Sequence, residues 1–169
     1  MHAPAKARPI QYGAKIQTTT EDKSKPLPEE GIKRIQKAVG MYVWYGHASD
    51  PTMTKTLSST ANKQAKATEN VKAECNHFLD YCHIHTDARV GFVVSDMILA
   101  LHSDGSYNSE PGSKSRAGGH FYMSDKRNYN LTNGAVLTLS KIIKYVMSSA
   151  GETEAASSYL NCKAELPLR

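Results

Sequence analysis

The chain has 169 residues, of which 40% are hydrophobic and 22% charged, a composition that excludes global disorder and allows one core or one and a half small domains. Its net charge of +5 is compatible with a polyanionic partner, but the basic residues are spread out and predict no strong nucleic-acid patch. Three cysteines make no disulfide framework, and neither a signal peptide nor an apolar run long enough to span a membrane is present.

Residues 1–28 predict a flexible basic arm. They contain four prolines, a run of three threonines and five Lys or Arg, but little apolar surface whose burial could offset the entropy lost on ordering. We expect no folded element in this segment.

Three helices are expected after the arm, at residues 29–46, 50–64 and 68–83. Apolar residues recur at three- and four-residue steps in the first and third helices, and the many Thr and Ser of the second weaken its pattern. Asp50 followed by Pro51 is typical of a helix start, and Thr68 is a helix cap. Cys75 and Cys82 belong to the apolar stripe of the third helix, so we interpret them as core residues rather than zinc ligands.

From residue 89 the apolar period becomes two, which indicates strands. We expect strands at 89–95, 97–107, 116–124 and 135–149, then a helix at 149–166. The second strand begins apolar on both faces, which predicts a central position in the sheet. Gly118 and Gly119 favour a close backbone approach or a bulge, and Ser149 with Glu152 has the spacing of a capping box.

Two carboxylates could form a metal site. Asp104 follows the apolar half of a strand in "HSDGSY", where it is either an ordinary turn residue or a ligand for a hard cation. Glu154 lies about 200° around the helix from Glu152, so it can face the sheet if Glu152 serves the cap. A strand carboxylate and a helix carboxylate could then share a divalent ion.

The stretch "SDMILALHSDGSYNSEPGSKSRAGGHFYMS", followed by "NGAVLTLSKIIKYVMSSAGETEA", resembles the ribonuclease H domain of copia-type LTR-retrotransposon polyproteins. In that family a strand with "SDASY" precedes a Gly-containing strand and an "SS-x-x-E-A-E" helix. Upstream, "IQKAVGMYVWYGHASDPTM" and "ATENVKAECNHFLDYCHIHTDA" resemble the segment that joins reverse transcriptase to this domain. The resemblance covers roughly residues 9 to 169.

The resemblance implies an α+β fold in which a helical N-terminal segment precedes an incomplete ribonuclease-H-like sheet of three to four strands with one packed C-terminal helix. The implied organisation is an arm (1–28), a helical connection (29–88) and a partial ribonuclease-H-like domain (89–169). We expect a cytoplasmic location, with the nucleus as the alternative.

The implied activity is cleavage of RNA in an RNA–DNA hybrid with two Mg²⁺ ions. Carried over by position, Asp104 and Glu154 would be both the catalytic residues and the metal ligands. Ser106 would lie beside the site. Lys114 and Arg116, expected in a loop beside it, are either phosphate contacts or ordinary solvated charges. The expected partners are an RNA–DNA hybrid or other nucleic acid and the rest of a polyprotein, with no membrane.

The chain also departs from the family. The family continues past the helix to a strand bearing a third aspartate, whereas this chain stops at Arg169. We therefore expect a polyprotein fragment with weak or absent Mg²⁺ binding and little or no nuclease activity alone. The alternatives are a non-catalytic nucleic-acid-binding or interaction module and a subunit completed by another polypeptide.

Overall fold

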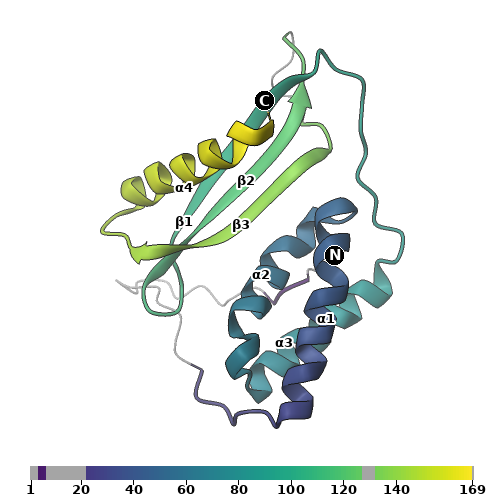
Figure 1. Cartoon of the computed structure of the whole chain (residues 1–169), viewed down its shortest axis with the longest axis vertical. Helices are drawn as coiled ribbons and strands as arrows, with labels where there is room; N and C mark the ends of the chain where they lie inside the picture. The colour runs from purple at the N-terminus through teal and green to yellow at the C-terminus, as the bar shows by residue number, and fades with distance from the viewer. Residues whose placement is uncertain (1–3, 7–21, 127–131, 169) are drawn as a thin grey trace. The chain divides into compact units, whose positions relative to one another are not determined.

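The structure, a computed structural model, describes residues 4–6, 22–126 and 132–168. These residues fall into two compact units that divide between Arg89 and Val90, where the sequence predicted a boundary between Ala88 and Arg89. Four helices and one three-stranded antiparallel sheet are described, so the fold belongs to the expected α+β class (Figure 1).

The first unit is helical. Its elements are α1 (Glu29–Ala48), η1 (Pro51–Met53), α2 (Thr54–Lys63), η2 (Gln64–Lys66) and α3 (Glu69–Ile84). The apolar stripes of these helices face one another, as their periodicity predicts: Ile35 and Val71 pack in one buried cluster and Leu57 and Phe78 in another.

The predicted helix starts of the first unit are confirmed. The side chain of Asp50 accepts a hydrogen bond from the backbone N–H of Thr52, and Thr68 accepts one from Val71. Asp50 also accepts a hydrogen bond from the Tyr81 hydroxyl at 2.9 Å, which links the start of η1 to α3.

Residues 22–28 differ from the expected flexible arm. The backbone N–H of Leu27 donates to Ala67, and that of Glu69 donates to Lys25. The Asp22 carboxylate accepts hydrogen bonds from Thr68 and Asn70. These bonds, together with the burial of Leu27, order a segment that the proline count alone assigned to the arm. The remaining arm residues, apart from 4–6, lie outside the described part of the chain.

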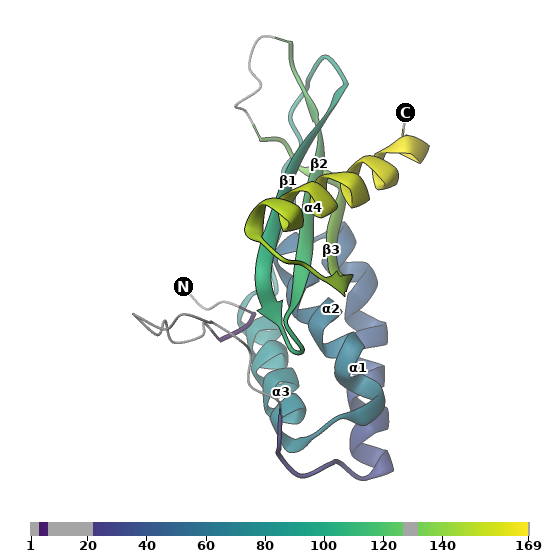
Figure 2. The same cartoon turned by 90° about the vertical axis from the view of Figure 1, so that its left-hand side faces the viewer.

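The second unit has one sheet and one long helix. Its elements are β1 (Ile98–Glu110), β2 (Lys114–Ser124), β3 (Ala135–Val146), α4 (Ala150–Glu165) and η3 (Leu166–Leu168). The strand order is β1-β2-β3, both pairs are antiparallel, and α4 crosses one face of the sheet over β1 and β2 (Figure 2).

The strand predicted at residues 89–95 is absent, so that prediction is wrong. The segment is extended, but its backbone is bonded by a side chain: the Asn133 amide accepts from Val93 N–H and donates to the Val93 carbonyl, both at 2.9 Å. The Asn133 amide pairs with both backbone groups of Val93 alone in this segment, whereas a strand ladder bonds a series of residues.

The central position expected for the 97–107 strand is also wrong among the described strands. That strand is β1, which lies at the sheet edge, and its apolar residues Ile98–Leu101 are only half-buried. Apolar residues on both faces are typical of a strand with two neighbours, whereas the structure describes one neighbour for β1.

The face of α4 that meets the sheet is polar and tightly fitted. Thr153, Ser157 and Asn161 recur every four residues and are fully buried. Ser157 donates from its hydroxyl to the Asp104 carbonyl, and the Asn161 amide donates to the Gly118 carbonyl at 2.8 Å. A Cβ atom at Gly119 would overlap the Asn161 side chain, which confirms the close approach predicted for the paired glycines.

Candidate nucleic-acid interface

The sheet face that Asp104 occupies follows from its neighbours in β1. Ser103 bonds to Asn161 on α4, and an added Cβ at Gly105 would meet the backbone of Thr153, so both residues face the helix. Because side chains alternate along a strand, Asp104 points to the other face, where its side chain is exposed.

Glu154 does not face the sheet, contrary to the expectation. The buried residue of that turn is Thr153, and Glu154 lies about 100° further around the helix, where it is exposed. The expectation assumed that the residue opposite the capping Glu152 meets the sheet. The buried position falls between these two glutamates, because the helix uses small polar residues as its packing face.

The two carboxylates therefore do not form a built metal site. They point from different faces of the sheet-and-helix layer, and both are open to water. Within the described residues, no group of three or more His, Cys, Asp or Glu side chains is placed to hold a metal ion. Mg²⁺ binding in proteins depends on carboxylates gathered in near-octahedral geometry, so Asp104 and Glu154 as placed do not fit the ions that the resemblance implies.

The remaining predicted contact residues lie on strands, Ser106 on β1 and Lys114 and Arg116 on β2. Ser106 on β1 is exposed and pairs in register with Arg116 on β2. Arg116 is buried: its Nε donates to the Glu110 carboxylate at 2.7 Å, and its Nη1 donates to the Ser140 hydroxyl. The structure thus gives Arg116 a structural role instead of the phosphate contact expected from the sequence. Of Lys114 and Arg116, only Lys114 is exposed.

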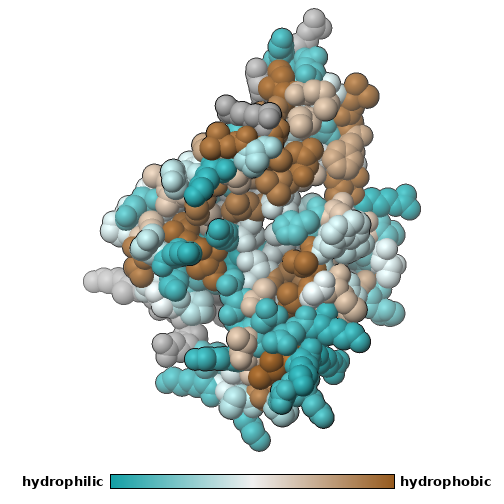
Figure 3. Space-filling model, in the orientation of Figure 1, coloured by the Kyte–Doolittle hydropathy of each residue, from teal (hydrophilic) through white to brown (hydrophobic). Residues whose placement is uncertain are grey.

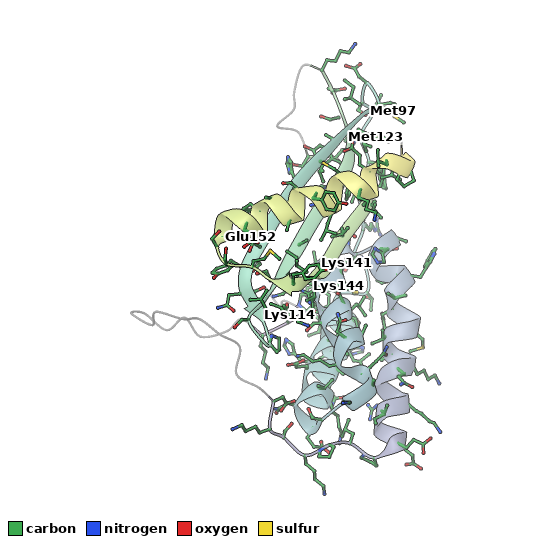
Figure 4. All side chains as sticks on the ribbon, turned by 60° about the vertical axis from the view of Figure 1, so that its left-hand side comes forward. Met97, Lys114, Met123, Lys141, Lys144 and Glu152 are labelled. Carbon is green, nitrogen blue, oxygen red and sulfur yellow. The ribbon has the colours of Figure 1, made fainter. Side chains whose placement is uncertain are left out.

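Lys114 belongs to a cluster that the sequence analysis missed. Lys141 and Lys144 on β3 are also exposed, and Lys114 pairs in register with Val146, two residues from Lys144. Figure 4 shows the three lysines near the same end of the sheet. We call them the lysine cluster. The signal for it was two lysines interrupting an apolar strand in "LSKIIKYV".

No carboxylate among the described residues pairs with the lysine cluster. Glu152, at the start of α4, accepts hydrogen bonds from the backbone N–H and the hydroxyl of Ser148 at 2.5 and 2.7 Å. Those bonds to the charged form lower the pKa of Glu152, with the Ser148 hydroxyl as the largest cause. The cluster therefore presents three positive charges that form no ion pair with a carboxylate in the described part of the chain. These charges are available to pair with an external polyanion.

The sheet face opposite α4 carries two histidines and a buried tyrosine on the same side as Asp104. His102 and His120 are direct partners in the β1–β2 register, and the Tyr122 hydroxyl lies 2.9 Å from His102 Nε2. His120 Nε2 lies 3.2 Å from the Asn133 carbonyl oxygen. Each imidazole thus uses one ring nitrogen within the fold, which favours a structural role for both.

Two of the three cysteines are core residues. Cys75 and Cys82 are buried in the helical unit, as expected, and all three cysteines are free. Burial raises the pKa of both thiols, that of Cys82 to about 11, with the negative charge of Asp50 as a further cause. The burial of Cys75 and Cys82 in the apolar stripe of α3 confirms their interpretation as core residues.

Comparison of the chain with protein-family models, with curated proteins and with solved structures gives no match. The relation to copia-type ribonuclease H domains therefore stays a prediction from the sequence motifs. No helix in the described part of the chain has the length and apolar character needed to cross a bilayer.

Proposed function

We propose that the second unit binds nucleic acid through the lysine cluster, and that it does not cleave its ligand by itself. The proposed ligand is an RNA–DNA hybrid, a choice that comes from the resemblance to copia-type ribonuclease H domains. In this proposal the chain derives from a retrotransposon polyprotein and acts in the cytoplasm or the nucleus.

The observation that carries the proposal is the lysine cluster at one end of the sheet. Lys114, Lys141 and Lys144 are exposed, and the pairing of β2 with β3 brings their backbones to one end of the sheet, so three positive charges gather there. When lysines bind phosphates, counterions are released from the nucleic acid, and this release favours binding. Lysines that have no internal ion pair are available for such contacts.

The positions of the two carboxylates support the proposed lack of cleavage. Two-metal hydrolysis requires ligands that hold both ions on one phosphate. Asp104 and Glu154 point from different faces of the layer, so the activity implied by the resemblance has no assembled ligand set among the described residues.

Fluorescence anisotropy with a labelled RNA–DNA hybrid tests this proposal. The variant changes Lys114, Lys141 and Lys144 together to Gln. The matched control changes Lys37, Lys55 and Lys66, three exposed lysines of the helical unit, to Gln, and so has the same net charge. For a duplex, each lost phosphate contact lowers the slope of log K against log salt by about 0.9.

We expect the cluster variant to lose about 2 to 3 units of salt slope and the control to keep the slope of the original chain. Equal losses in both variants would show that binding depends on net charge alone and would contradict the proposal. Incubation of the hybrid with Mg²⁺ or Mn²⁺ should leave it intact. Cleavage that disappears in Asp104→Asn would instead support the nuclease alternative.

A further inference from the structure

Among the residues that the structure describes, the first half of β1 is an edge strand without the usual protection. Residues 97–101 read Met-Ile-Leu-Ala-Leu, with no charge and no proline, and Ile98–Leu101 are only half-buried. The preceding segment adds exposed side chains at Phe92, Val93 and Val94. Figure 3 shows apolar side chains gathered over this upper part of the sheet unit, and Figure 4 shows Met97 and Met123 at the same end of the sheet.

The other edge of the sheet is charged in its second half. β3 carries Lys141 and Lys144, both exposed, and charged side chains on an edge strand oppose pairing with another chain. Charged side chains thus lie in the second half of β3, whereas the first half of β1 carries none.

We infer that β1 is a dimerisation edge, on which a second copy of this chain pairs antiparallel and extends the sheet. A pairing centred on Ala100 places Leu99 of each copy opposite Leu101 of the other. The apolar stretch of the strand is thereby paired with itself, and the backbone groups of the edge gain partners.

Charge favours a second copy as the occupant. Within Ile98–His102 no Asp, Glu, Lys or Arg is present, so symmetric pairing brings no like charges together, and a charged partner strand would gain no ion pair. The lysine cluster lies at the opposite end of the sheet, around the Lys114–Val146 pair, and includes the other edge. Pairing along β1 therefore keeps the two basic clusters apart.

The ends of the pairing are set by the chain. Met97 has a φ of 58°, in the left-handed region, so the backbone turns away from the strand direction just before β1. Beyond His102 the residues that would follow are Ser103 and Asp104, where α4 begins to contact the strand through Ser157. The free edge is thus about five residues long, which fits a dimer that dissociates on dilution.

Sedimentation velocity over a range of concentrations tests the inference. The full chain should form a dimer that dissociates on dilution. Ala100→Lys places two ammonium groups opposite each other at the centre of the pairing, and should raise the dimer dissociation constant at least about tenfold. Val136→Lys, at an exposed site on the other edge, is the matched control and should leave the constant unchanged.

A charge-pairing experiment tests the register. Ala100→Lys and Ala100→Glu should each be monomeric alone, and an equimolar mixture should recover the dimer because opposite charges then face each other. If either variant fails to fold, hydrogen exchange of the original chain gives the same test: amides of residues 98–102 should become more protected as concentration rises. A chain that stays monomeric, or a dimer that survives Ala100→Lys in a folded protein, would overturn the inference.

Discussion

At the scale of single residues, the attachment of α4 to the sheet depends on Asn161. Its buried amide donates to Ser103 Oγ at 2.7 Å and to the Gly118 carbonyl at 2.8 Å. Asn161→Ala leaves both acceptors without this donor, so we expect the free energy of unfolding to fall by about 1–3 kcal/mol in urea denaturation. Asn62→Ala, at an exposed amide on α2, should change it by less than about 0.5 kcal/mol. Equal effects at the two sites would contradict this account.

Gly105 allows β1 to lie close to α4. An added Cβ would lie 2.9 Å from the Thr153 carbonyl oxygen, and a helix backbone cannot shift as a flexible side chain can. We expect Gly105→Ala to lower the melting temperature and to cost about 1–3 kcal/mol by overpacking. Gly40→Ala on α1 should have the opposite effect on stability. A Cβ added at Gly40 would meet no neighbouring atom within 4 Å, so the substitution should stabilise the chain by about 0.5–1 kcal/mol.

At the scale of elements, the β1–β2 hairpin is held near its turn by a buried ion pair. The Glu110 and Arg116 side chains are 5% and 6% exposed. Removing one partner leaves the other charge buried and unpaired. Glu110→Ala should therefore lower the free energy of unfolding by about 3–5 kcal/mol. Glu74→Ala breaks the exposed pair with Lys63 and should cost less than about 1 kcal/mol. Chemical denaturation of both variants compares the two, and a cost at Glu110 no larger than that at Glu74 would refute the buried role.

The start of α4 predicts a pH dependence. The pKa of Glu152 is lowered from its ordinary value of 4.5, so its hydrogen bonds to Ser148 stabilise the fold above that pH. The stabilisation is lost as pH falls through the lowered pKa of the folded state. Glu152→Gln should therefore destabilise the chain at neutral pH, and the difference from the original chain should shrink on acidification in urea denaturation. A difference that stays constant as the pH is lowered would contradict the role of the charge.

The elements with strong local signals could be predicted from the sequence. The caps at Thr68 and Ser149 and the apolar stripe of α3 are set by residues within one or two turns, so local pattern is sufficient for them. The failures involve longer range. The segment 89–95 alternates like a strand, but Asn133, which is distant in sequence, bonds its backbone in place of a ladder. The apolar pattern of β1 predicted a neighbour on each side, which the described sheet does not supply.

At the scale of the whole molecule, the candidate site was only partly predictable. Lys114 was singled out from its sequence position, whereas the burial of Arg116 depends on Glu110 and Ser140, which only the folded hairpin brings to it. The lysine cluster forms because β2 and β3 pair antiparallel. This pairing joins residues that are distant in sequence, so the local pattern "KIIK" could not predict it. The prediction that Glu154 faces the sheet failed because the packed side of α4 consists of small polar residues rather than apolar ones.

The central claim, that the lysine cluster binds nucleic acid, is tested most directly by NMR titration of the labelled chain with an RNA–DNA hybrid. The account predicts that the largest shift changes lie at Lys114, Lys141, Lys144 and their strand neighbours, and that they vanish in the triple Gln variant. Shift changes confined to the helical unit, or spread evenly over all exposed lysines, would contradict it.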